Sequence, residues 1–332
     1  MFWCGVVLAS LLLTVKLSGI GAIVDFEKEI QVSCVNNEND TKFHLFNIKY
    51  DPKMHARTYK FNQTDAAKIK ELMGNWDKVN FFFLGHEDRL YSYSGRSFII
   101  AREQMFNTNS VSCTISYDFL CGPDLMKYLQ YFTTTVGHRI PKVVEMASTF
   151  IRHIVDSTDI KINLSGVYLT GFCLGGHIAG NVGYELKRFY KGQMVPTVWA
   201  FDPPALGFSH PSKAGEPRRV QKGDAQAVVV FHTSTLGVKK TIADVDIIVN
   251  ESKDQPGCEK QTIGMFCDHY AAFILRELVV LHSDKLLLNK NGIPFAFAYD
   301  YSDQYPFDII NPALNKSGKY YLRTQAVFGA KS

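Results

Sequence analysis

The chain lacks several features that would assign it at once to a large class of proteins. Outside its N-terminal region it has no apolar run long enough to cross a membrane, and it has no internal repeat or low-complexity tract. Its 36 basic and 32 acidic side chains nearly balance and form no run of one sign, so nothing points to a nucleic-acid partner. Its 7 cysteines are too sparse for a small disulfide-framed domain, and no histidines have the spacing of metal ligands. A core-forming globular protein without a metal or cofactor is therefore expected.

The N-terminal segment has the composition of a secretory signal peptide. An apolar stretch too short to span a bilayer is followed by small residues between Ser18 and Ala22 that suit signal peptidase. No positive charge precedes this stretch, so an uncleaved anchor is the alternative. We predict a signal peptide over residues 1–22, a secreted, extracellular protein and one domain over residues 23–332.

Two further features fit a secretory route. Candidate glycosylation sites of the form Asn-x-Ser/Thr occur at Asn39, Asn62, Asn163, Asn250 and Asn315. Six of the cysteines lie beyond the predicted signal peptide, and most of them should pair in an oxidising compartment.

Apolar runs typical of buried strands alternate with helical segments along the chain. Strands are expected at residues 79–84, 111–117, 167–170, 198–201 and 227–231. An amphipathic helix is expected at 141–154, and the strand-like stretch 293–328 should complete the same domain. This alternation predicts an α/β fold with a mostly parallel sheet. Because each predicted strand ends in glycine or polar residues, we expect the functional site at the carboxyl edge of the sheet.

Residues 166–187, GVYLTGFCLGGHIAGNVGYELK, are the most informative segment. A β-prone run leads through Gly171, Cys173 and Gly175 into apolar residues at helical spacing. A strand, a sharp turn and a helix form the context of the G-x-S-x-G nucleophile elbow of hydrolases, in which the central side chain is held exposed in a strained conformation. Here the central side chain is the thiol of Cys173 instead of a serine hydroxyl.

An elbow nucleophile needs an acid and a histidine that follow it in the chain. Asp202 follows a predicted strand, and His269 lies just before a helix-like segment, 270–281. The acid would orient the imidazole, and the imidazole would take the proton of the nucleophile and pass it to the leaving alcohol. Taken singly, an Asp-Pro turn and a histidine are more often structural than catalytic. On residue types alone, a catalytic triad and a purely structural role therefore both stay open. The remaining histidines of interest are interpreted as structural: His86, His177 and His232.

Five motifs in order along the chain carry a family resemblance. They are GFCLGGH at 171–177, AFDPP at 200–204, QPGC at 255–258, CDH at 267–269 and GKYYLRT at 318–324. From about residue 75 to its end, the chain resembles the secreted pancreatic-lipase-like family, in which these motifs read G-H-S-L-G-x-H, G-L-D-P-A, Q-P-G-C, C-S-H and G-x-Y-Y-L-x-T. That family contains triacylglycerol lipases, phospholipases A1 of insect venoms and the non-enzymatic yolk proteins of flies. The resemblance implies an α/β-hydrolase fold and a lipid partner.

The resemblance also implies roles for individual residues. Cys173 would be the nucleophile, Asp202 the acid and His269 the base. The backbone N–H groups of Leu174 and Glu87 would form the oxyanion hole. The family has H-G and an aromatic residue in this segment, whereas this chain has Gly85-His86-Glu87. The carboxylate of Glu87 is unfavourable beside an oxyanion unless it points away.

The cysteines and the length of the chain give two further expectations. Cys258 and Cys267 should form a bridge at the base of the lid, and Cys173 should be free. Cys34 is expected to pair with Cys121, which would tie down the N-terminal segment. The stretch that follows His269 is too short for the family's second, β-sandwich domain, so none is expected.

Two functional hypotheses follow from the cysteine in the elbow. In the first, a Cys-Asp-His triad hydrolyses carboxylic esters as a phospholipase A1 does. A thiol is a strong nucleophile, but the thiolate leaves the tetrahedral intermediate more readily than the alkoxide of the substrate, so attack tends to revert. In the second, the chain is a catalytically inactive homologue with a lipid-binding, yolk or storage, or signalling role.

The short lid indicates the class of lipid. Only eight residues separate Cys258 from Cys267, and a lid of this length leaves the site open to water and polar head groups. Phospholipids or other polar lipids are therefore predicted in preference to triacylglycerol. A membrane or lipoprotein surface is an expected partner, with Ile263, Met265 and Phe266 as candidate contacts, and the oligomeric state stays open.

Overall fold

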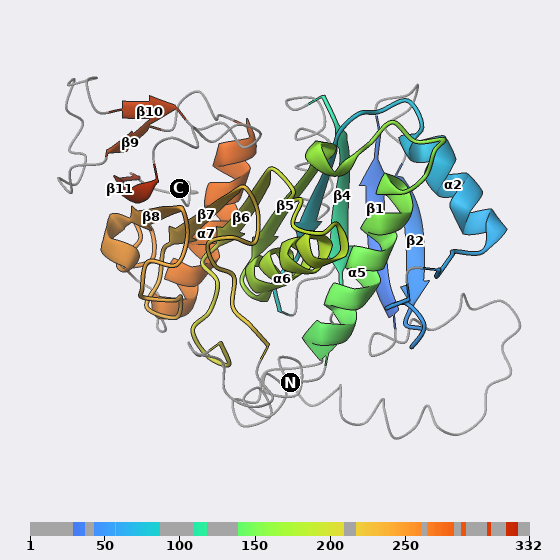
Figure 1. Ribbon diagram of the computed structural model, residues 1–332. Coiled ribbons are helices and arrows are strands. Elements are labelled where there is room, and N and C mark those ends of the chain that lie inside the picture. The colour runs from blue at the N-terminus through green and yellow to red at the C-terminus, as the bar shows by residue number, and fades with distance from the viewer. Residues whose placement is uncertain are drawn as a thin grey trace, which may run out of the picture.

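In the computed structural model, strands from both ends of the chain join one sheet, and helices cover both faces (Figure 1). The structure describes residues 29–36, 43–56, 58–86, 109–117, 139–208, 217–259, 264–281, 287–289, 304–306 and 317–324. Within these ranges no helix is both long enough and apolar enough to cross a membrane.

The described strands form an 11-stranded sheet in the order β10-β9-β11-β8-β7-β6-β5-β3-β4-β1-β2. Their bounds are β1 Glu29–Val35, β2 Phe43–Lys49, β3 Val79–Phe83, β4 Val111–Ser116, β5 Val167–Phe172, β6 Thr197–Phe201, β7 Ala227–His232, β8 Val245–Val249, β9 Leu287–Asn289, β10 Gln304–Pro306 and β11 Gly318–Leu322. Neighbours from β4 through to β11 are parallel, whereas β1, β2, β9 and β10 add antiparallel pairs at the two edges. The predicted α/β fold with a mostly parallel sheet is confirmed.

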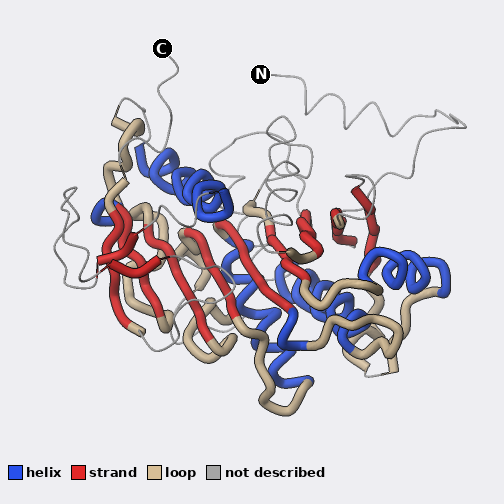
Figure 2. Tube along the Cα trace, turned by 90° about the horizontal axis from the view of Figure 1, so that it is seen from above, coloured by secondary structure: helices blue, strands red, loops and turns tan. Residues whose placement is uncertain are grey.

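The central strands are apolar because both faces of the sheet are covered. Every residue of β3, β5, β6 and β7 is buried, which fits their high content of valine and aromatic residues. The described helices are α2 (Gln63–Met73), α5 (Ile140–Val155), α6 (Leu174–Phe189) and α7 (Gly264–Leu281), with short 3₁₀ turns at Leu164–Gly166 and Asn250–Ser252. Figure 2 shows α7 on one face of the sheet and α5 and α6 on the other. The helix predicted at 141–154 is α5.

The parallel order brings the ends of successive strands to one edge of the sheet. Cys173 follows β5, Asp202 follows β6, and His232 is the last residue of β7. Strands β5, β6 and β7 are direct neighbours, so residues far apart in the chain meet where these strands end.

Two disulfides occur within the described ranges. The predicted bridge between Cys258 and Cys267 is formed. The predicted pairing of Cys34 with Cys121 is wrong, because Cys34 pairs with Cys113. Strand β1 lies antiparallel beside β4, and this register places Cys34 directly opposite Cys113, with Cα atoms 4.0 Å apart. Cys121 itself lies outside the described residues.

Candidate active site

The turn after β5 holds Cys173 in a conformation that few non-glycine residues adopt. Its φ is 56° and its ψ is −128°, and it precedes the first residue of α6. The turn is tight because two glycines lack side chains: a Cβ on Gly171 would lie 2.1 Å from the carbonyl oxygen of Gly175. A Cβ on Gly175 would lie 2.1 Å from the carbonyl oxygen of Phe83. The absence of side chains at Gly171 and Gly175 therefore permits an elbow with the free thiol of Cys173 at its apex.

Asp202 lies at the end of β6 and is fully buried. Its Oδ1 accepts hydrogen bonds from the backbone N–H groups of Thr233, at 2.8 Å, and Ser234, at 3.1 Å. The hydroxyl of Ser234 donates to Oδ2 of the same carboxylate. Gly237 passes so close that a Cβ there would lie 2.5 Å from Oδ1. A buried carboxylate needs such donors, and they hold Asp202 in one orientation.

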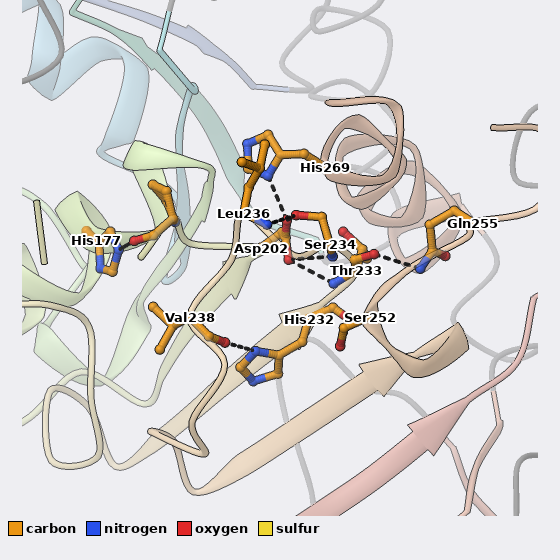
Figure 3. A network of polar contacts seen from close by, with 11 residues as sticks. His177, Asp202, His232, Thr233, Ser234, Leu236, Val238, Ser252, Gln255 and His269 are labelled. Carbon is orange, nitrogen blue, oxygen red and sulfur yellow. Dashed lines mark hydrogen bonds and ion pairs between the residues drawn. The ribbon is translucent and has the colours of Figure 1, made fainter. Parts of the chain in front are cut away.

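His269 joins Asp202 to Cys173. Its Nδ1 donates a hydrogen bond to Oδ2 of Asp202 over 2.6 Å, as Figure 3 shows. The imidazole also hydrogen-bonds with the side chain of Cys173. Since Nδ1 is engaged by Asp202, Nε2 is the nitrogen that faces the thiol. The structure therefore brings together the three residues that the sequence analysis selected.

The charge state of His269 depends on both neighbours. Burial by itself lowers the pKa of His269, but the negative charge of Cys173, the hydrogen bonds with Asp202 and Cys173, and the charge of Asp202 outweigh it. Together these interactions raise the pKa of His269 to about 10, from an ordinary value of 6.5. The imidazole of His269 is therefore protonated at neutral pH.

The position of His269 in its helix differs from the prediction. A helix was expected only from residue 270, but α7 begins at Gly264, so His269 lies in its second turn. The reason is that Met265 and Phe266 are 44% and 42% exposed, so the first turn of α7 has no buried apolar face for sequence periodicity to reveal. The helix fixes the backbone of His269, which a loop would leave less constrained.

The predicted oxyanion donors are only partly within the described chain. Leu174 is the first residue of α6, so its backbone N–H has no partner within the helix and can face a ligand. Glu87 lies outside the described residues. Phe172 replaces the histidine of the family elbow motif, and its ring packs on the imidazole of His269 with centroids 5.0 Å apart.

Two other buried histidines have no nitrogen left for chemistry. His177 donates from Nε2 to the carbonyl of Pro204 and accepts the N–H of Val220 at Nδ1, and burial lowers its pKa to about 3. His232 contacts the carbonyl of Val238 through Nδ1 and Asp246 through Nε2, each over 2.8 Å. Within the described residues, no group of His, Cys, Asp and Glu side chains could hold a metal ion.

The candidate glycosylation sites differ in how free their amides are. Asn163 is exposed and its Oδ1 accepts from Ser165, whereas Asn62 caps the start of α2 and its Nδ2 donates to Asp65 over 2.7 Å. Asn250 is already engaged: its Nδ2, the atom to which a glycan attaches, donates to Gln255 and Thr324 over 2.8 Å each. The remaining two, Asn39 and Asn315, lie outside the described residues, as does the predicted signal peptide.

Two residues that hold Asp202 and its neighbouring turn in place were not predicted from the sequence. Ser234 binds Asp202 twice, and Gln255 contacts the neighbouring turn. The signal that was available for Ser234 is its place two residues after the end of β7, beside the strand that carries Asp202.

Comparisons with known proteins agree with the geometry. A family model described as Lipase matches residues 27–273. "Phospholipase A1 2" of Dolichovespula maculata is 34% identical over 154 residues, which cover 45% of this chain and 46% of that protein. "Phospholipase A1 member A" of Rattus norvegicus is 30% identical over 139 residues, or 40% of this chain and 29% of that protein. The matched part thus spans less than half the length of these relatives.

Solved structures of a lipase/esterase and a carboxylesterase also match parts of the chain. One is a lipase/esterase from Lactobacillus plantarum, with a TM-score of 0.33 and 12% identity, covering 74% of this chain and 85% of that one. Another, the carboxylesterase EstE1 from a metagenomic library, has a TM-score of 0.28 and 12% identity, covering 57% and 52%.

Proposed function

This chain belongs to the Lipase family, and from that premise we propose that it is a secreted hydrolase of phospholipase A1 type, cleaving the sn-1 ester of polar lipids. The observation that carries the proposal is that His269 contacts both Asp202 and the elbow thiol of Cys173. The relatives that are named phospholipase A1 support this choice of reaction.

The first half of the proposed reaction transfers the acyl chain to the protein. The sulfur of Cys173, whose proton rests on His269, attacks the ester carbonyl and forms a tetrahedral intermediate with a new C–S bond. The backbone N–H of Leu174 donates to the developing oxyanion. When the C–O bond breaks, His269 gives its proton to the departing lysolipid oxygen. The product is a thioester on Cys173.

The second half requires His269 to change its role. The negative charge of Cys173 is one cause of the raised pKa of His269, and that charge disappears when the sulfur is acylated. Acylation therefore lowers the pKa of His269 and leaves Nε2 able to accept a proton from water. The hydroxide attacks the thioester, the C–S bond breaks, and the fatty acid leaves while the proton returns to the Cys173–His269 pair.

The preference for polar lipids is supported by the segment between Cys258 and Cys267. Its eight residues are too few to cover a broad apolar trench. Met265 and Phe266, at the start of α7, are exposed and precede His269 by one helical turn. We propose that they contact the surface of a membrane or lipoprotein beside the site.

A hydrolysis assay on purified full-length protein tests the proposal. Phospholipid vesicles and emulsified triacylglycerol are the substrates, with His269→Ala and Cys173→Ser as variants and Gln226→Ala, an exposed position, as the matched control. The expected result is release of sn-1 fatty acid from vesicles by the wild type and the control and none by His269→Ala. Preference for the emulsion would contradict the substrate class.

The second candidate function is lipid binding without turnover, and it is favoured by the cysteine at the elbow. A sulfur displaces the attacked carbonyl from a site built for oxygen, so catalysis can be lost while binding is kept. In the same assay, hydrolysis by Cys173→Ser alone, with vesicle binding by both forms, would select this function and overturn the first.

A further inference from the structure

Gln255 uses every polar group it has, although it lies in a turn and not in a helix or strand. It is fully buried. Its Nε2 donates to the carbonyl oxygens of Thr233, at 2.8 Å, and Val249, at 2.9 Å, and its Oε1 accepts from Asn250. Its backbone carbonyl accepts the N–H of Cys258 over 2.9 Å. Only a primary amide of this length offers two donors and an acceptor to these partners.

The side chain of Gln255 reaches the acid. Thr233, whose carbonyl it binds, is the residue whose N–H donates to Asp202 over 2.8 Å. Figure 3 shows Gln255, Thr233 and Asp202 in this order, with Ser234 beside Thr233 at the carboxylate. The carbonyl of Thr233 shares its peptide group with the N–H of Ser234, which donates to Oδ1 of Asp202 over 3.1 Å, so holding this carbonyl also holds a donor to the carboxylate.

The backbone of Gln255 reaches the base. Its N–H donates to Oδ1 of Asp268 over 2.7 Å, and the N–H of Asp254 donates to Oδ2 over 3.2 Å. Asp268 immediately precedes His269 in α7 and is 6% exposed. The disulfide between Cys258 and Cys267 ties the same turn to the same helix covalently. The turn at Gln255 is thus fastened to the helix that carries the base.

We propose that Gln255 is a positioning residue, which keeps Asp202 and His269 at hydrogen-bond distance by tying the turn after β7 to the first turns of α7. A single residue joins the two because its side chain binds one segment and its backbone binds the other. A catalytic role for this positioning rests on the proposed function, but the positioning itself can be tested without measuring ester hydrolysis.

The test compares Gln255→Met with wild type in the full-length protein. Methionine has a similar volume and no amide, so the cavity stays filled while both donors are lost. The rate of alkylation of Cys173 by iodoacetamide is measured across pH, because it reports the contact of the thiol with His269. We expect alkylation at neutral pH to slow by about tenfold and its profile to move to higher pH. Gln226→Met, at an exposed glutamine, is the control and should match wild type.

The possible results separate this inference from the proposed function. An unchanged alkylation profile in folded Gln255→Met overturns the inference, even if that variant melts at a lower temperature. If Gln255→Met does not fold, Asp268→Ala, which cuts only the backbone link, decides by the same measurement. A wild type that alkylates as expected but hydrolyses no ester refutes the proposed function and leaves the role of Gln255 intact.

Discussion

Two histidine–aspartate pairs lie near the same edge of the sheet, and they differ in what the second ring nitrogen meets. In both, an imidazole nitrogen is within 2.8 Å of a buried carboxylate: His269 with Asp202 and His232 with Asp246. The other nitrogen of His232 is bound by the backbone carbonyl of Val238, whereas the other nitrogen of His269 faces the thiol of Cys173.

The comparison shows that a His–Asp contact alone does not indicate catalysis. The pair at His232 ties β7 to β8 and to the backbone of Val238, and Asp246 is fully occupied by the N–H groups of Ile242 and Ala243. The pair at His269 ends in a group that can react. Of the two pairs, the one at His269 is therefore the candidate for proton transfer to a substrate.

The largest expected effect comes from His269→Ala. Ester hydrolysis should fall by on the order of 10⁶-fold, as when a triad base is removed from a serine protease, because the thiol loses its proton acceptor. The protein should remain folded, because the buried carboxylate of Asp202 keeps its hydrogen bonds from Thr233 and Ser234. Initial rates on phospholipid vesicles and urea unfolding check both parts. Substantial residual turnover would mean that another residue is the base.

His232→Ala is expected to lower the stability of the fold and to leave the reactivity of Cys173 unchanged. This change leaves the buried carboxylate of Asp246 and the carbonyl of Val238 without their hydrogen bonds to the ring, which should cost about 1–3 kcal/mol of unfolding free energy. Urea denaturation measures the loss. The folded fraction should still react at Cys173 at the wild-type rate, and slowed alkylation there would show that the two pairs are coupled instead of separate.

Ser234→Ala tests the comparison more finely. It removes the hydroxyl donor to Asp202 and leaves the backbone donors in place, so we expect kcat to fall about tenfold with KM unchanged. Ser252→Ala is the matched control, because its hydroxyl donates to the carbonyl of His232 over 3.0 Å. Equal losses in both variants would remove the distinction between the pairs.

The parts of the site that depend on local sequence were predictable. The glycines around Cys173 and the strand before Asp202 are short-range patterns, and β3, β5 and β6 are mostly apolar because both faces are buried. The order of Cys173, Asp202 and His269 along the chain predicted that these three residues act together, which no single residue could indicate.

The parts that depend on register were not predictable. The partner of Cys34 is set by the antiparallel alignment of β1 with β4, which no local pattern encodes. Ser234 contacts Asp202, and Gln255 contacts Thr233, through turns whose conformations follow from tertiary contacts, including a run of positive φ values from Asn250 to Ser252. The first turn of α7 was not predicted because its apolar side chains are exposed.

The measurement that tests the central claim most directly is an NMR titration of the His269 imidazole in wild type and in Cys173→Ala. If the thiol and the imidazole form one proton-sharing pair, wild-type His269 stays protonated through neutral pH and loses its proton as the pH rises through about 10. In Cys173→Ala, the charge and hydrogen bond of the sulfur are gone, so the pKa should fall well below that of wild type. A wild-type pKa near the ordinary 6.5, unchanged by Cys173→Ala, would contradict the account.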